Sequence, residues 1–131
     1  MLLGVHCSIK GGLHNAFHEA ESLGIDTFQI FTKNQRQWKE KIIDTEEKST
    51  FLNTYKTSHV KMIFSHASYL INLASNDDTL RERSIKALIG EVQRCHDLGL
   101  EFTILPPGSA KALGVQKGII KIITALTTTL H

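Results

Sequence analysis

Apolar and polar positions along the chain change their spacing four times in the same order. Four short runs are rich in β-branched, aromatic or aliphatic residues and leave no room for a helical face, so each is predicted to be a buried strand: 2–5, 27–31, 62–64 and 102–105. After each run, apolar residues recur at the three- and four-residue spacing of an amphipathic helix. A strand followed by a helix, four times over, predicts parallel strands and an α/β fold.

The first two predicted helices carry signals at their ends. In the first, Gly24 supplies the helix stop after a set of apolar residues at helical spacing, which are Leu13, Ala16, Phe17, Ala20 and Leu23. In the second, Asp44 is expected to cap the helix while Glu47 reaches back to it, as in a capping box. The apolar stripe of the second helix is formed by Phe51, Leu52 and Tyr55.

The third and fourth predicted helices are longer. Ser75 or Asn76 is expected to cap the third helix. Its predicted apolar face consists of Ile85, Leu88, Ile89, Val92 and Cys95. Its charged residues are expected to face solvent, and they are Arg81, Glu82, Arg83, Lys86 and Glu91. After a break at 106–108, the fourth helix is predicted from Val115, Ile119, Ile122, Ile123, Leu126 and Leu130.

An internal repeat supports the count of four units. Residues 22–31 (SLGIDTFQIF) resemble residues 97–106 (DLGLEFTILP), and each copy covers a helix end, a glycine stop and a strand. The copies are 75 residues apart, which matches two strand–helix units of roughly 30 or more residues each. No linker or low-complexity segment interrupts the pattern, so residues 1–131 are predicted to form a single domain.

The composition is that of an ordinary globular chain, with 41% hydrophobic and 21% charged residues in a length of 131. A net charge of +2 is too small to indicate a nucleic-acid partner by itself. Cys7 and Cys95 lack the spacing of a metal finger, so we expect reduced thiols and a cytoplasmic protein. No apolar run approaches the roughly 18 residues of a membrane span, and no membrane role is expected.

A polar loop, residues 33–38, directly follows the second predicted strand. It brings together two cations, three side-chain amides and the single tryptophan of the chain, and it contains no Gly, Pro or Asp. Cations suit phosphates, amides suit base edges, and aromatic or guanidinium planes suit stacking, so the loop is a candidate for nucleic-acid contacts. The alternative is a solvated loop whose Trp38 covers the core.

Several chemically active residues share one predicted location. His6, the polar loop, His66 and residues 106–109 all follow strands. Because parallel strands present their carboxyl ends at one rim, these residues are expected to converge on a ligand site. From its position alone, His6 is read as a site-lining or hydrogen-bonded histidine and not as a ligand.

Three motifs, in the same order, carry a resemblance to a known family. GVHCSIKGGLHNA at 4–16, FTKNQRQW at 31–38 and HASYLINLA at 66–74 resemble the N-terminal half of the endonuclease IV family, the zinc-dependent apurinic/apyrimidinic (AP) endonucleases. The resemblance runs from about Leu3 to the end of the sequence. It implies a TIM barrel of the xylose-isomerase type, of which about four of the eight (β/α) units are present, since that family has roughly twice as many residues.

The resemblance also implies roles for particular residues. A zinc cluster would polarise the phosphate 5′ to an abasic site and generate hydroxide, and His66 matches its first ligand. In the family, a loop that matches the tip of the polar loop enters the minor groove, and residues that match Tyr69 and Leu70 help to occupy the base stack. Lys33 is a further DNA-binding candidate because its charge lies in the same basic, amide-rich loop. The residues at the tip are Asn34, Gln35, Arg36 and Gln37. The implied partner is DNA that contains abasic sites.

One departure from the family pattern concerns the metal. Where the family has a His-Pro-Gly-Ser sequence, with its histidine as the next ligand, this chain has Pro106-Pro107-Gly108-Ser109. Proline has no lone pair for a metal, and the family's remaining ligands lie in its second half. The sequence up to His131 therefore predicts an incomplete zinc site, no assignable catalytic residue and little or no activity for this chain alone.

Two other hypotheses stay open. One is a metal-dependent sugar isomerase or epimerase on a related barrel, which would not explain FTKNQRQW. The other is a non-catalytic fragment that binds DNA, or a half-barrel that forms a homodimer through its open edges. In that case an uncovered inner face is expected at Phe28, Ile30, Ile63 and Ile104.

Overall fold

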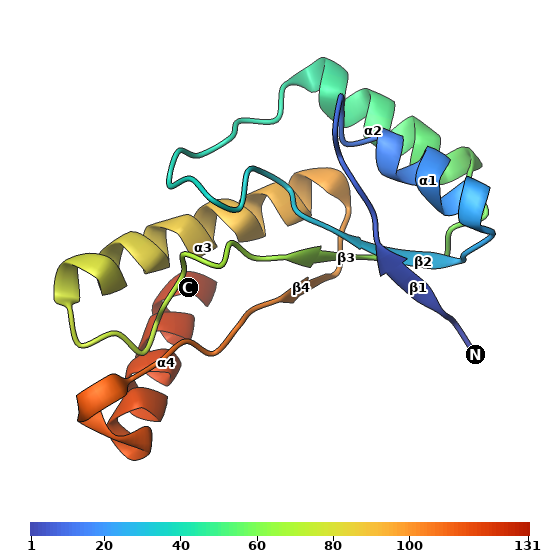
Figure 1. Ribbon diagram of the computed structural model, residues 1–131. Helices are drawn as coiled ribbons and strands as arrows, with labels where there is room; N and C mark the ends of the chain where they lie inside the picture. Colours follow the sequence, from blue (N-terminus) through green and yellow to red (C-terminus); the bar gives the residue numbers. More distant parts are fainter.

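The computed structural model describes residues 1–131 as alternating strands and helices (Figure 1). The strands are β1 (Gly4–His6), β2 (Thr27–Ile30), β3 (Met62–His66) and β4 (Phe102–Ile104). The α-helices are α1 (Asn15–Leu23), α2 (Thr45–Thr57), α3 (Asp78–Leu98) and α4 (Val115–Leu130), and a short 3-10 helix, η1 (Lys111–Leu113), precedes α4. The predicted α/β class and all four strand–helix units are confirmed.

The four strands form one parallel sheet in the order β1-β2-β3-β4. Val5 pairs with Phe28, Phe28 with Ile63, and Ser65 with Thr103. Right-handed crossovers between successive parallel strands place the helices on one face of the sheet. The carboxyl ends of all four strands consequently lie along one rim.

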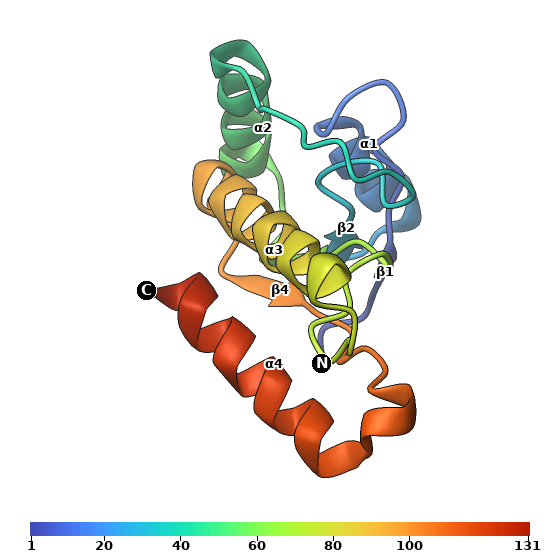
Figure 2. The same ribbon diagram turned by 90° about the vertical axis from the view of Figure 1, so that its left-hand side faces the viewer.

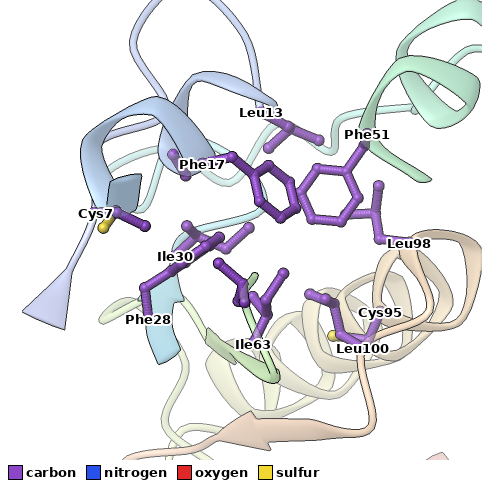
Figure 3. Packing of buried hydrophobic residues seen from close by; sticks show 13 residues of the cluster. Cys7, Leu13, Phe17, Phe28, Ile30, Phe51, Ile63, Cys95, Leu98 and Leu100 are labelled. Carbon is purple, nitrogen blue, oxygen red and sulfur yellow. The ribbon is translucent and has the colours of Figure 1, made fainter. Parts of the chain in front are cut away.

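The main hydrophobic core lies between this face and the first three helices. Phe17 of α1 packs edge-on against Phe28 of β2, with ring centroids 5.2 Å apart, and lies 5.1 Å from Phe51 of α2. Figure 3 shows the rings of Phe17 and Phe51 above Ile30 and Ile63, with Leu98 of α3 beside Phe51. A smaller cluster joins α3, α4 and the segment after β3, and its buried members are Ala67, Ile71, Leu73, Ala87, Leu88 and Ala125.

The helix ends follow local chemistry, with two differences from expectation. Gly24 ends α1 in the left-handed conformation at φ 64°, as predicted. Asp44 caps α2, and its side chain accepts a hydrogen bond from the Glu47 N–H at 2.8 Å, but the Glu47 carboxylate accepts from Lys41 instead of returning to Asp44. Helix α3 is capped by Asp77, which accepts from the Leu80 N–H at 3.1 Å, and not by Ser75 or Asn76.

Four residues were predicted to form the uncovered inner face of the sheet, and this prediction is wrong for three of them. Phe28, Ile30 and Ile63 are buried against the helices. The opposite, open face carries Gln29, Phe64 and Phe102, which the strand register places side by side, together with Ile104, which is 43% exposed. Strands of a barrel are apolar on both faces, so alternation in the sequence does not say which face meets the helices.

The long helices also differ in detail from their predicted faces. Glu91, expected in solvent, is buried, and Ile89, expected in the core, is exposed. Helix α4 packs through its small residues Gly118 and Ala125, where a methyl group added to Gly118 would lie 2.6 Å from the Ala110 Cβ. Ile122 and Leu126 also pack against the smaller cluster, as predicted. The other large apolar residues of α4 are exposed, and they are Val115, Ile119, Ile120, Ile123 and Leu130. None of the helices is long and apolar enough to cross a membrane.

Candidate functional site

An aromatic cluster marks the rim where β1, β2 and β3 end. The Phe31 ring centroid lies 4.4 Å from that of His6, 5.4 Å from His66 and 5.6 Å from Tyr69. His66 and Tyr69 are themselves 5.0 Å apart. The structure therefore brings together His6, His66 and Tyr69, which the sequence placed on one rim. Phe31 at the centre of the cluster was not predicted as part of the site, because in the sequence it only ends a strand.

The hydrogen bond made by His66 selects the tautomer that a metal ligand needs. Its Nδ1 lies 2.7 Å from the Ala67 carbonyl oxygen, and since a carbonyl only accepts, Nδ1 carries the proton. In the neutral form of the ring, Nε2 is then the nitrogen with a free lone pair. His6 lies nearby with its Nδ1 2.8 Å from the Gln29 amide nitrogen. Burial, followed by the electrostatic effect of the neighbouring His66, lowers the pKa of His6 below its usual value.

The donor set of the chain does not by itself fit a zinc cluster. No group of three or more His, Cys, Asp or Glu side chains converges anywhere in the chain. At the end of β4, where the second ligand was expected, Pro106 has no donor atom. A catalytic zinc ion ordinarily takes three protein ligands. His66 is thus a single candidate ligand, and no chemical step through zinc follows from these residues alone.

The polar loop is built around a buried lysine. Lys33 is only 5% exposed, and its ammonium donates to the carbonyl oxygens of Gln37 and Lys39 and, at 3.5 Å, of Asn34. Burial lowers its pKa, because the charged form is separated from water. This corrects the expectation that Lys33 presents its charge to DNA. Its side chain instead holds the loop closed from inside.

The tip of the loop does face solvent. The Asn34 side chain accepts from the Arg36 N–H at 2.9 Å, which turns the chain at the tip. Asn34, Arg36 and Gln37 are exposed, and Gln35 is half-buried. Trp38 packs against the smaller cluster, and the Arg83 guanidinium lies 4.7 Å from the centre of its ring. The alternative reading of Trp38, that it covers the core, is confirmed, while the tip remains free for contacts.

Side-chain hydrogen bonds join the loops that follow three strands. Ser68, after β3, donates to the Gln35 carbonyl oxygen at 2.7 Å. Asn72 and Ser109, after β3 and β4, exchange two hydrogen bonds of 3.0 Å. Gly108 is needed beside them, because an added Cβ would lie 2.2 Å from the Asn72 Oδ1. Tyr69, 66% exposed, and the half-buried Leu70 therefore lie on one connected surface with the polar loop.

A buried polar network behind the loop was missed by the sequence. Glu91 of α3 contacts Thr32, just before the polar loop, and Arg94 contacts both Thr32 and Glu40, two residues after the loop. A signal was present, because Glu91 lies on the helical stripe formed by the buried residues Ala87, Leu88, Cys95 and Leu98. A carboxylate inside an apolar stripe indicates a buried partner and not a solvated face.

Comparisons with known proteins agree with this architecture. A family model described as xylose isomerase-like TIM barrel matches residues 17–130. The probable endonuclease 4 of Chloroflexus aggregans is 39% identical over 124 residues, which are 95% of this chain and 43% of the relative. That of Geobacter sp. (strain M21) is 40% identical over 95% of this chain and 44% of its own length. The chain thus spans less than half the length of these curated relatives.

Solved structures show the same partial match. Endonuclease IV from Thermus thermophilus superposes with a TM-score of 0.80 and 32% identity over 95% of this chain and 46% of its own. A D-tagatose 3-epimerase-like protein superposes with a TM-score of 0.69 but 14% identity, which is a likeness of fold alone. The predicted half-barrel and its resemblance to endonuclease IV are confirmed. The chain belongs to the xylose isomerase-like TIM barrel family.

Proposed function

We propose that this chain binds DNA containing abasic sites through the rim at the strand ends. One observation carries the proposal: the Ser68 to Gln35 hydrogen bond ties the exposed tip of the polar loop to the segment that exposes Tyr69. A cation, amides and an aromatic ring thereby lie on one connected surface. The relatives named endonuclease 4 support DNA as the ligand.

Each part of this surface suits a different part of a damaged duplex. Arg36 carries the exposed charge for phosphate oxygens, while Asn34, Gln35 and Gln37 offer donors and acceptors to base edges. Tyr69 and Leu70 form an apolar wedge of the kind that replaces an unstacked nucleotide. Lys33 contributes by maintaining the shape of the loop.

We also propose His66 as one ligand of a zinc site whose other ligands come from outside residues 1–131. When bound in such a site, zinc supplies a Lewis acid for the phosphate and hydroxide as the nucleophile. The contribution of this chain is to orient the imidazole, because the Ala67 carbonyl fixes its tautomer. The cavity beside β2, lined by His6, Phe31, Lys33 and Asn34, has room for a DNA group next to it.

The proposal is tested by fluorescence anisotropy with a duplex that carries a tetrahydrofuran abasic analogue and the matching intact duplex, at low salt. The wild-type chain should prefer the abasic duplex. Tyr69→Ala should lose most of this preference, because the wedge is gone. Ile42→Ala removes an apolar side chain that is 91% exposed and lies outside the aromatic cluster, and it serves as the control. Equal affinity for the two duplexes, or an unchanged preference in Tyr69→Ala, would overturn the proposal.

A further inference from the structure

We propose that Glu91 and Arg94 of α3 are positioning residues for the polar loop, which they hold through Thr32 before it and Glu40 after it. The expected effect on DNA affinity rests on the function proposed above, whereas the positioning of the loop in the DNA-free protein does not. The connection between β2 and α2 that contains the loop passes over α3 (Figures 1 and 2). Within this connection, the polar loop lies between Thr32 and Glu40, the two residues that contact Glu91 and Arg94.

The contacts form a closed set. Arg94 Nε donates to the Thr32 hydroxyl at 2.8 Å, and that hydroxyl donates to Glu91 Oε2 at 2.9 Å. A second guanidinium nitrogen donates to the same carboxylate oxygen at 2.9 Å, and the third pairs with Glu40. The side chains of Arg94 and Glu91 are 5% and 2% exposed. One guanidinium therefore contacts the residue before the loop and a residue just after it.

The chemistry explains why this set holds one geometry. A buried charge persists only when it is paired and hydrogen-bonded, so Arg94 and Glu91 require each other. The planar fork of an arginine can reach three partners at fixed angles, which a lysine ammonium on a flexible stem does not reproduce. With both flanks held, the buried Lys33 ammonium can close the loop on its own carbonyls, and the tip with Arg36 projects from a defined base.

Gly90 supplies the room for the outer contact. A Cβ built at this position would lie 2.4 Å from the Glu40 carboxylate oxygen and 3.3 Å from an Arg94 guanidinium nitrogen. Glycine within a helix is otherwise unfavourable, because alanine has the higher helix propensity. Gly90→Ala should therefore favour the helix and at the same time displace Glu40 from Arg94. If Gly90 served only the stability of the helix, its replacement by alanine would not combine a more stable helix with a displaced Glu40.

The test uses the single tryptophan, Trp38, as a reporter of the loop in the DNA-free protein. Glu40→Ala and Gly90→Ala should both shift Trp38 emission to the red and increase its quenching by acrylamide. Both should weaken binding to the abasic duplex about tenfold, the size expected for loss of a charged hydrogen bond. The melting temperature of Gly90→Ala should not fall. Gln93→Ala, an exposed change on the same helix, should alter none of these readouts.

Unchanged Trp38 emission and quenching in both variants would overturn the proposal. A changed Trp38 signal with unaltered DNA affinity would overturn the link between loop position and binding. If the variants change Trp38 but the wild-type chain binds no abasic duplex, the positioning of the loop is supported and the function proposed above is what fails. Glu40 is half-exposed, so its truncation tests the contact without opening the core.

Discussion

Lys33 and Arg36 lie three positions apart in one loop and have opposite environments. Lys33 is buried and donates to main-chain carbonyls, whereas Arg36 is exposed and only its main-chain N–H is engaged, by Asn34. A lysine ammonium is a compact set of three donors, which suits a cage of carbonyl oxygens. At the scale of residues, then, only one of the two cations is available to a phosphate.

Arg36→Ala is expected to weaken DNA binding and to flatten its salt dependence. Removal of about one phosphate contact should lower the slope of log affinity against log salt by about 0.9, because fewer counterions are released. Titrations of an abasic duplex over a range of salt concentrations measure this slope. Lys56→Ala removes a charge from the last turn of α2, far from the rim, and should leave the slope unchanged. An equal slope in wild type and Arg36→Ala would contradict the assignment.

Both thiols are expected to be unreactive in the folded protein. Burial raises the pKa of Cys7 and of Cys95 from 9.0 to about 11. Since the folded state holds these protons more tightly than the unfolded state, their contribution to stability is complete below pH 9 and is lost as the pH rises toward about 11. Iodoacetamide should therefore modify the native chain slowly and the urea-unfolded chain quickly. The wild-type chain should lose stability at alkaline pH, and the Cys7→Ala, Cys95→Ala double variant should lack this loss. Rapid alkylation of the native protein at neutral pH would refute the expectation that both thiols are unreactive.

At the scale of elements, neighbouring side chains compete for the same role at a helix end. Ser75, Asn76 and Asp77 are all good capping residues, but only Asp77 accepts from the first turn of α3. The Ser75 hydroxyl instead accepts from the Asp77 N–H at 3.1 Å and fixes the turn that leads into the helix. The negative charge of Asp77 also suits the positive end of the helix dipole.

Asp77→Ala is expected to lower the free energy of unfolding by about 1 kcal/mol, the usual value of a helix cap. Asn76→Ala, one residue earlier and exposed, should change it by less than about 0.5 kcal/mol. Urea unfolding followed by circular dichroism compares the two variants. Equal losses in both, or a larger loss in Asn76→Ala, would show that α3 begins elsewhere.

The whole molecule is an open half-barrel whose open sheet face is apolar. On the open face, Phe64 and Phe102 have ring centroids 5.6 Å apart beside the exposed Ile104. Strands β1 and β4 each have one unpaired edge. Exposed edges and contiguous apolar patches are features that soluble monomers avoid.

We propose that two copies associate about a two-fold axis along the barrel axis. This operation keeps all strands parallel and places β4 of one copy beside β1 of the other, so eight strands could close. Light scattering should show a dimer, and Ile104→Lys on the open face should weaken it. Ile89→Lys, at an equally exposed site on α3, is the control. A non-aggregating monomer that binds no hydrophobic dye would contradict the proposal.

The chain alone is expected to show no appreciable, chelator-sensitive incision of abasic DNA. His66 is one candidate ligand, no group of three converges, and metal-generated hydroxide needs a complete site. Pro106→His should not restore activity, because two imidazoles remain too few. Gel assays with and without chelator measure incision, and strong chelator-sensitive cleavage by the purified wild-type chain would refute the expectation.

Local signals in the sequence determined the order of elements. Short apolar runs, helical spacing, the Gly24 stop and the Asp44 cap act over a few residues, so they predicted four strand–helix units and their parallel arrangement. The same signals placed His6, His66 and the polar loop at strand ends, and hence on one rim. The motifs at 4–16, 31–38 and 66–74 identified the family resemblance.

Only the tertiary structure decided which face each residue occupies and which partner each polar group finds. Phe28 and Phe64 are equally apolar, yet Phe28 meets the helices and Phe64 lies on the open face. Barrel strands are apolar on both faces, so the sequence pattern does not distinguish the two sides. Lys33 and Glu91 are charged, and charged residues are usually exposed to solvent, but both are buried here. Their partners lie across a loop or 59 residues away at Thr32, and burial of a charge depends on such contacts, which no local pattern encodes.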